Sequence, residues 1–499
     1  MMRIVKFLKR NKFEIILFLL LLVLVCKAWL MLPQLTSRGD SFAAMLSRQQ
    51  YDFWHSRYPL ASLLVSEMIL GAIMPKIFGV HFSYYYWFEL VVILLIAVLF
   101  YVVIKAITKN YLVAFSASLL LSVSYFGVYD MVSTHCYCFF LERIIPVPFL
   151  ISSFWFLHLF LEGEKRKYLI FSLLFYFLGV GLGHFSILIT PLFFFYAVFY
   201  KFQFKKKYKE KIKGIFLGCL YVLLTAFFVA IQQINESGIS PHQWTFVGFF
   251  LNPQKYLYFK KIALQFVYWS QYPVFLQSLS RNPMSSFLDF RDAPIYIPLT
   301  LVVYLLVGFT IYKRLPKQRF MLFTVMLALP IIFYLNGYLG QYDMLNFTGA
   351  SRYLYHPTFL LAIFWSYFLW AVFWQKKNIL LLGGFLLLAL YYVINVWLIN
   401  SNIVYEIKWN KPTRMLFEYV LSHRSKLDPK TLVIVTYPEF GSQESTFFTE
   451  QIGKGQVQYL SDNNLVNPIT WESTSSSSAH VIKLKYGEKC TCVIEERVK

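Results

Sequence analysis

The stretch FEIILFLLLLVLVCKAWLML at residues 13–32 decides what kind of protein this is. A helix needs about 20 apolar residues to cross the hydrocarbon core of a bilayer, and this stretch has that length. The basic segment KFLKRNK precedes it, as in a secretory signal, but no small-residue cleavage site follows it. We therefore expect a retained membrane anchor.

The rest of the chain repeats this pattern. Of its 499 residues, 58% are hydrophobic and only 14% are charged, which is outside the range of an ordinary soluble domain. About eleven stretches have the length and apolar character of a membrane span. They lie near residues 13–32, 83–104, 111–130, 144–161, 168–183, 186–200, 214–234, 296–313, 319–338, 353–374 and 378–400. The sequence predicts a polytopic α-helical membrane protein.

Positive charge gathers in short loops between these stretches. The formal net charge is +22. Clusters such as EGEKRKY (162–168), KFQFKKKYKEKIK (201–213) and YKRLPKQR (312–319) carry much of it. Short loops rich in Lys and Arg are typical of the cytoplasmic side, so we read the charge as a topology signal with some attraction to anionic lipid, and not as a nucleic-acid surface. This places the N-terminus in the cytoplasm of a plasma-membrane protein, and an odd number of spans places the C-terminus outside.

Two neighbouring spans are unusually short, because the basic loops before and after them both favour the cytoplasm. The segment GVGLGHFS (179–186) lies between them and contains three glycines. We expect a helical hairpin that is broken at this segment, with glycine supplying the turn.

The predicted external parts divide the chain in two. Residues 1–400 form the membrane domain, with a first external loop at 33–82 and a second long loop at 235–295. Residues 401–499 are predicted to form a small external α+β domain. Its segment WNKPTRMLFEYVLSHRSK (409–426) resembles a short amphipathic helix, and TLVIVTYP, VQYL, HVIKLKY and CTCVIEE have strand patterns.

Cysteines and metals give weak signals. Cys136 and Cys138 fall in one predicted external loop, and Cys490 and Cys492 in the external tail, so an oxidising compartment would permit a bridge between them. Whether these sulfurs pair stays open. No second His or Cys cluster accompanies HCYC (135–138), so no metal-ligand set is evident, although the need for a divalent metal also stays open.

The most informative charged residue is Asp40 in TSRGDSF (36–42), directly after the first span. Ionisable residues at a membrane boundary are either solvated surface groups or functional ones. The loop continues through HSRYPL (55–60) into a semi-apolar helix that is interrupted by Pro75. We expect this loop to fold as a cap on the outer membrane surface.

Three motifs resemble the C-type superfamily of polytopic glycosyltransferases that use polyprenyl-phosphate sugars, which includes protein O-mannosyltransferases and lipid A aminoarabinose transferase. The first runs from RYPLASLL (57–64) through PKIFG to the second span. The second is ASRYLYHPTFLLAIF (350–364), and the third, weaker one is LGHFSILITPLF (182–193). The resemblance covers about residues 1–400 and rests on the order and topological placement of the motifs.

The resemblance implies an inverting sugar transfer outside the cytoplasm. In that superfamily a first-loop acid acts as general base on the acceptor, and the matching residue here is Asp40. Relatives often have two adjacent acids whereas this chain has one, so Asp52 is a second acid or an alternative base. Arginines would bind the donor phosphate, with Arg352 ranked first and Arg57, Arg143 and Arg38 after it. Tyr353 and Tyr355 of the same motif are the expected substrate-binding residues.

Two other functions stay open. An envelope-polysaccharide polymerase or ligase would also use external arginines, and the 235–295 loop keeps that option. A lipid-linked sugar flippase or transporter is the other, although transporters place polar sites at the membrane midplane and have repeats, and we find no repeat. The chain has no Gly-rich phosphate loop after a strand, which argues for a lipid-linked donor over a nucleotide sugar. The expected partners are a polyprenyl-phosphate-linked sugar, an extracytoplasmic protein, lipid or glycan acceptor, and membrane lipids.

Overall fold

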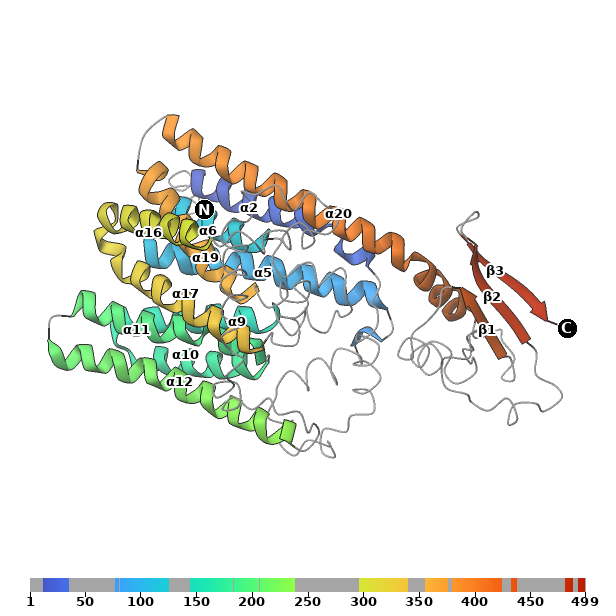
Figure 1. The fold of residues 1–499 in the computed structure, drawn as a ribbon, viewed down its shortest axis with the longest axis horizontal. Helices are drawn as coiled ribbons and strands as arrows, with labels where there is room; N and C mark the ends of the chain where they lie inside the picture. Colours follow the sequence, from blue (N-terminus) through green and yellow to red (C-terminus); the bar gives the residue numbers. More distant parts are fainter. Residues whose placement is uncertain are drawn as a thin grey trace, which may run out of the picture.

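The computed structural model describes residues 12–35, 77–79, 81–124, 144–182, 184–205, 207–237, 296–339, 355–375, 379–423, 432–437, 481–487 and 492–498. These residues form a bundle of helices, with a small sheet at one end (Figure 1). The helices are α2 (Lys12–Trp29), α5 (Phe82–Thr108), α6 (Tyr111–Ser122), α9 (Pro146–Gly163), α10 (Arg166–Gly181), α11 (Thr190–Phe204), α12 (Tyr208–Ser237), α16 (Tyr296–Arg314), α17 (Arg319–Leu339), α19 (Tyr355–Leu369) and α20 (Ile379–His423). Short 3-10 or π segments are η1 (Leu32–Gln34), η4 (His184–Ile189), η7 (Pro316–Gln318) and η9 (Trp370–Trp374).

Each predicted span coincides with one of these helices, but the structure does not confirm the predicted number of crossings. Among the described residues, 6 helices are long and apolar enough to cross a membrane, or up to 7 if a bent pair counts as one span. That pair is Leu301–Arg314 with Pro316–Ile332, and the chain bends by 115° at the break between them. The helices α6 and α19 are shorter than a full span. The chain is therefore a mostly helical integral membrane protein, and the count of eleven crossings is not confirmed.

Successive helices alternate in direction, so the bundle has two distinct ends. The connections α5–α6, α9–α10, α11–α12 and α16–α17 lie together at one end, which we call the basic end. Contacts between the connections show this. Glu162 lies 3.8 Å from Lys109, and Glu164 lies 2.9 Å from Lys201. Gln203 donates to the Lys317 carbonyl oxygen at 2.9 Å and accepts from the Phe320 N–H at 2.8 Å. We call the other end of the bundle the opposite end.

Tight turns close two of the connections at the basic end. Lys109 ends α5 with φ 55°, and Glu164 ends α9 with φ 54°, so both residues adopt the left-handed conformation. That conformation terminates a helix and usually belongs to glycine. Its use by two long charged residues allows the next helix to begin within two residues, and so draws α6 and α10 back along the helices before them.

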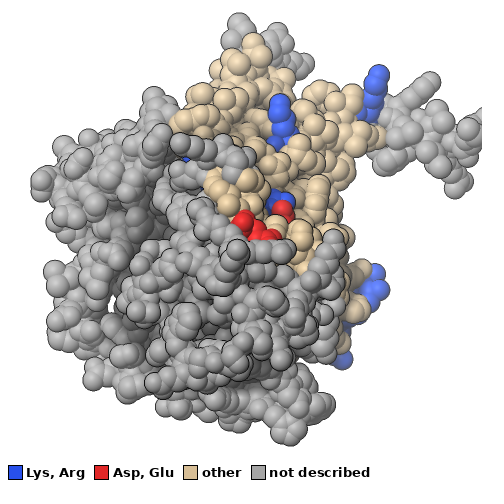
Figure 2. Space-filling model, turned by 90° about the vertical axis from the view of Figure 1, so that its right-hand side faces the viewer, with Lys and Arg blue, Asp and Glu red and all other residues tan. Residues whose placement is uncertain are grey.

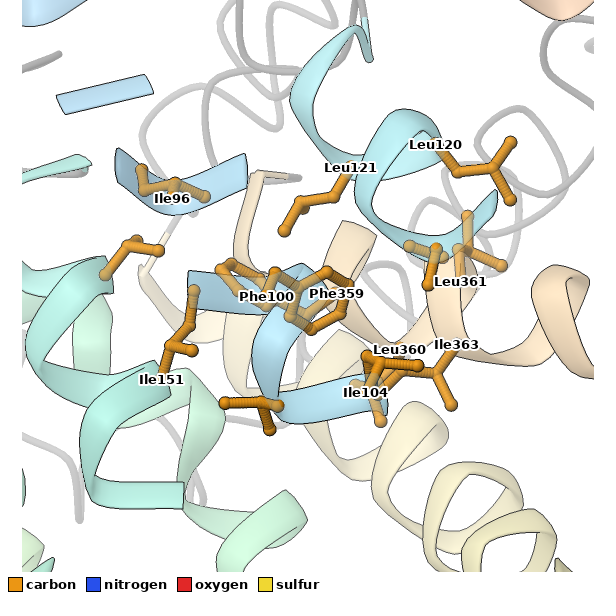
Figure 3. Packing of buried hydrophobic residues seen from close by; sticks show 14 of the residues in the cluster. Ile96, Phe100, Ile104, Leu120, Leu121, Ile151, Phe359, Leu360, Leu361 and Ile363 are labelled. Atoms are coloured by element: carbon orange, nitrogen blue, oxygen red, sulfur yellow. The ribbon is translucent and has the colours of Figure 1, made fainter. Parts of the chain in front are cut away.

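The apolar core lies where α5, α6, α9 and α19 meet. Phe100 of α5 and Phe359 of α19 contact edge to face, with ring centroids 5.6 Å apart at 85° (Figure 3). Ile96 and Ile104 extend the α5 side of this core, and Leu121 of α6 points into it (Figure 3). Large side chains on the outer faces stay exposed because the bilayer, and not water, surrounds them.

Hydroxyl groups join α9, α10, α11 and α12 inside the apolar region. Ser172 contacts the Tyr221 hydroxyl at 2.6 Å and donates to the Ser153 carbonyl at 2.7 Å. In a second set, the Tyr176 hydroxyl lies 2.7 Å from both Thr190 Oγ1 and Thr225 Oγ1. In a membrane, helices associate through such close packing and hydrogen bonds. These four helices are therefore held as one group.

The break predicted around GVGLGHFS is present. The helix α10 ends at Gly181, η4 follows it, and α11 begins at Thr190. The two halves touch where the Tyr176 ring lies 4.9 Å from that of Phe193, but α10 packs mainly on α9 and α11 mainly on α12 and α17. The six residues of η4 separate α10 from α11 and allow α12 to pack against both.

The C-terminal part contains a three-stranded sheet in the order β1 (Leu432–Tyr437), β2 (Val481–Gly487) and β3 (Cys492–Val498). The strands β1 and β2 are parallel, and β2 and β3 are antiparallel with Val481 opposite Val498. Three of the four predicted strands are thus present, and VQYL lies outside the described residues.

The predicted separate amphipathic helix is instead the last part of α20, which is 45 residues long (Figure 1). It passes the predicted domain boundary at residues 400–401 without a break and contacts β2 and β3. The hydroxyl of Tyr419 near its end donates to the Glu495 carboxylate on β3. The division into domains at residue 400 stays a prediction.

Candidate functional site

The residues predicted to act in chemistry fall almost entirely outside the described part of the chain. These are Asp40, Asp52, Arg38, Arg57, Arg143, Arg352 and Tyr353. Tyr355 is the first residue of α19, and only its place in that helix is described. The structure therefore neither brings these side chains together nor separates them, and their roles stay predictions.

The described helices nevertheless establish where the segments that carry these residues begin and end. Residues 36–76 connect η1 to the short stretch before α5, and residues 125–143 connect α6 to α9. Residues 238–295 connect α12 to α16, and residues 340–354 connect α17 to α19. All of these helix ends lie at the opposite end of the bundle, because their other ends meet at the basic end. The helix ends that flank these four segments thus all lie at one end of the protein.

Hydrogen bonds between helices hold the framework beneath these segments. Trp29 at the end of α2 donates its indole N–H to the Ser122 carbonyl at 2.8 Å, which fixes the end of α2 to the end of α6. The hydroxyl of Tyr85 donates to the Gly79 carbonyl at 2.8 Å. Tyr391 of α20 donates to the Leu120 carbonyl at 2.7 Å. The ends of α2 and α6 and the middle of α20 therefore form a connected base for the long segments.

Glu89 is a carboxylate that the sequence analysis left without a role. It lies in the second turn of α5, close to the opposite end, and only 1% of its surface is exposed. Acidic residues are rarely buried at membrane depth, and they mark functional sites when they are. The signal in the sequence was its position as a single acid within the predicted span 83–104. Its burial could not be predicted, since hydropathy does not say which face of a helix points inward.

Charged groups also lie on the described surface at this end. Seen from there, acidic and basic side chains lie next to one another near the middle of the face (Figure 2). Arg414 of α20 pairs with Glu418 at 2.7 Å and donates to the Gln34 carbonyl of η1 at 3.0 Å. This arginine joins the outer half of α20 to the segment from which residues 36–76 start.

The basic end has a different electrostatic arrangement, because each of its described acidic residues forms an ion pair with a lysine. Glu164 contacts Lys201 and Lys205 at 2.9 Å each, and these two lysines lower the pKa of its carboxyl to about 2. Glu210 pairs with Lys213, and Glu162 lies 3.8 Å from Lys109. The contacts of Glu164 and Glu162 join neighbouring helices or turns, whereas Glu210 and Lys213 lie one turn apart within α12, so these paired charges serve structure.

Cysteine and metal chemistry can be described in part. Cys492 at the start of β3 is disulfide-bonded, whereas Cys26 and Cys219 are free thiols. The other three cysteines lie outside the described residues. Within the described ranges, no three His, Cys, Asp or Glu side chains come close enough together to hold a metal ion.

Comparison with known proteins gave one kind of match. No family model matches the chain, and no curated protein matches it. Among solved structures, it is similar to the crystal structure of the Archaeoglobus fulgidus oligosaccharyltransferase in complex with Zn and sulfate, with 13% sequence identity and a TM-score of 0.39. That similarity covers 90% of this chain and 62% of the archaeal one, so this chain spans less than two thirds of its length. A similarity of that size assigns neither a family nor an activity to this chain.

Proposed function

We propose that this chain is a membrane glycosyltransferase, which moves a sugar from a polyprenyl-phosphate carrier to an acceptor outside the cytoplasm. The observation that carries the proposal is that the helix ends flanking the four long segments all lie at one end of the bundle. Two of the three sequence motifs that resemble C-type glycosyltransferases, at 57–79 and 350–364, lie in those segments or next to them. A site that is built from several loops on a rigid set of helices is a common arrangement for enzymes.

The two ends of the bundle support the orientation that this function needs. Short connections rich in Lys and Arg are typical of the cytoplasmic side, and all of those described lie at the basic end. Cys492 in the sheet at the other end is disulfide-bonded, and disulfides persist in oxidising compartments outside the cytoplasm. The long segments and the C-terminal sheet would then face the side where the lipid-linked sugar is used.

The proposed reaction is a single inverting displacement. A carboxylate in residues 36–76, Asp40 in the first place and Asp52 in the second, takes the proton from the acceptor hydroxyl or amine. The acceptor atom attacks the anomeric carbon while the bond from that carbon to the phosphate oxygen breaks. Negative charge then builds on the polyprenyl phosphate. Arginines, with Arg352 first, stabilise that charge through paired hydrogen bonds.

The test is transfer from radiolabelled polyprenyl-phosphate sugars in membranes that contain the wild type or one variant. We expect Asp40→Asn to lower turnover by about 100-fold or more, the scale on which general-base catalysis contributes. Glu418→Gln is the matched control, because it removes a carboxylate from the same end and should leave turnover unchanged.

The outcomes separate the open assignments. Loss of turnover with Asp52→Asn alone would make Asp52 the base. If neither variant changes transfer, the base assignment is wrong. If no donor supports transfer while a labelled lipid-linked sugar crosses the membrane, the protein is a flippase or transporter instead.

A further inference from the structure

Three basic connections at the basic end form one continuous surface. Glu164 joins the α9–α10 turn to α11 through Lys201 and Lys205. Gln203 joins the end of α11 to the α16–α17 turn through the Lys317 carbonyl and the Phe320 N–H. Sequence could place these loops on one side of the membrane, but only the structure shows that they lie next to one another.

This surface carries excess positive charge. The described carboxylates of the basic end form ion pairs with Lys105, Lys109, Lys201, Lys205 and Lys213. Within the described ranges, the remaining cations have no carboxylate within ion-pair distance. They include Lys165, Arg166 and Lys167 before α10, Lys207, Lys209 and Lys211 at α12, and Lys313, Lys317 and Arg319 at the α16–α17 turn. The surface is therefore built to attract anions.

Aromatic rings place these cations at the height of the membrane interface. Lys313 lies 4.5 Å from the Phe309 ring centre, and the Arg319 guanidinium carbon lies 4.0 Å from that of Tyr312. Lys211 lies 5.4 Å from the ring centre of Phe202. Aromatic side chains with nearby Lys and Arg are typical of the boundary between headgroups and acyl chains.

Exposed apolar side chains adjoin the same cations. Phe216 of α12 is 70% exposed and lies one turn after the lysines that begin this helix, and Tyr208 is 78% exposed beside them. A ligand that satisfies both features needs an acidic head and an apolar tail. Nucleic acid and acidic proteins supply only the first.

We propose that this surface binds acidic phospholipids of the adjoining leaflet, with the junction of the α11–α12 and α16–α17 connections as its centre. The phosphate and acidic headgroup contact Lys207, Lys209 and Lys317, and the acyl chains lie along α12 and α16. The proposal does not depend on the enzymatic activity proposed above.

The test measures binding of phosphatidylglycerol and phosphatidylcholine to the purified full-length protein in mixed micelles, by counting bound lipids with native mass spectrometry. We expect phosphatidylglycerol to bind in preference, and binding to weaken in about 0.5 M salt because exposed charges are screened. The triple variant Lys207→Gln, Lys209→Gln, Lys317→Gln should lose about 100-fold in affinity, since each basic residue near an anionic surface contributes about fivefold.

A control variant tests whether the arrangement or only the net charge matters. Lys27→Gln, Lys408→Gln, Lys411→Gln removes three exposed lysines from the opposite end and should retain phosphatidylglycerol binding. Gln203→Ala keeps every charge but removes the joint between the two connections, and should weaken binding by about tenfold or less.

Three results would overturn the proposal. The two triple variants could lose affinity equally, which would leave net charge as the cause. Glycerol phosphate without acyl chains could displace the lipid at equal concentration, which would make this a soluble-phosphate site. Polyglutamate could displace it equally well, which would indicate an acidic protein partner.

Discussion

The two ends of the bundle differ in the length of their connections and in the contacts that hold them. At the basic end the connections are short, two of them close with left-handed residues, and each described acid has a basic partner. At the opposite end the connections are long, and the described framework under them is held by hydrogen bonds to backbone carbonyls. Under the proposed function, the basic end fixes the helices and the opposite end holds the reaction site. Substitutions at the two ends should then change different properties.

After the loss of turnover expected for Asp40→Asn, the largest effect should come from the arginine ranked first for the donor phosphate. We expect Arg352→Ala to weaken donor binding by about 10- to 100-fold, because a hydrogen bond to a charged group contributes about 1.5–3 kcal/mol. The matched control is Arg319→Ala, which removes an arginine from the basic end. Donor affinity is measured with the radiolabelled polyprenyl-phosphate sugar. An equal loss in both variants would contradict the division between the ends.

A second effect should appear in stability alone. A methyl group at Gly218 would lie 2.7 Å from Phe194 Cδ2 and 3.1 Å from the Phe194 carbonyl oxygen, so α11 and α12 would have to separate. We expect Gly218→Ala to lower the free energy of unfolding in mixed micelles by about 1–3 kcal/mol.

Gly308→Ala is the control for this substitution, because its methyl group would meet nothing closer than 3.8 Å, at Met326. It should be neutral or stabilising by about 0.5–1 kcal/mol, since alanine favours helix over glycine. Equal destabilisation by both variants would mean that α11 and α12 do not cross as closely as described.

Much of this helical framework could be predicted from hydropathy, because burial in lipid requires long apolar helices whose backbone groups are satisfied internally. The helix at each predicted span and the break before α11 follow from that requirement. The continuation of α20 to His423 could not be predicted from that requirement. Hydropathy detects where a helix leaves the membrane, and Ser401, Lys408 and Lys411 suit a helix in water as well as a loop.

Contacts between distant segments were less accessible to sequence reasoning. Nothing in the local pattern says that Gln203 reaches the Lys317 carbonyl, or that α12 packs against both α10 and α11. The candidate site depended on motif resemblance and on the predicted sidedness of loops, and the residues it named stay predictions. Glu89 shows the limit most clearly, because its burial follows from the packing around α5 and not from its neighbours in sequence.

A smaller effect should come from the hydroxyls that join α9 to α12. We expect Tyr221→Phe to destabilise the protein by about 0.6 kcal/mol, the average for a hydrogen bond between membrane helices. A double-mutant cycle with Ser172→Ala isolates the contact between the two hydroxyls, which lie 2.6 Å apart. A coupling free energy of zero would show that the hydroxyls fill space without holding the helices.

The smallest effect should be the pH dependence of the basic end. The pKa of Glu164 falls from 4.5 to about 2 because Lys201 and Lys205 favour its charged form. Its contribution to stability is therefore complete above about pH 4.5 and is lost as the pH falls toward 2. The difference in stability between wild type and Glu164→Gln should shrink over that window. The effect should be small, because the carboxylate is largely exposed. A stability difference between wild type and Glu164→Gln that grows on acidification would show that the charged form of Glu164 does not stabilise the protein.

The length of α20 gives the C-terminal sheet a fixed height. Its 45 residues span about 68 Å, roughly twice the thickness of the hydrocarbon core, and Arg414 pins its outer half to η1. The number of residues in a continuous helix sets both how far the sheet lies from the membrane and which way the sheet faces around the helix axis. Seven residues inserted after Glu418 would raise the sheet by about 10 Å and turn it by only about 20°, whereas two residues would raise it by about 3 Å and turn it by about 200°. Whatever the sheet meets outside the membrane, it meets at a distance and in a direction that the helix has set.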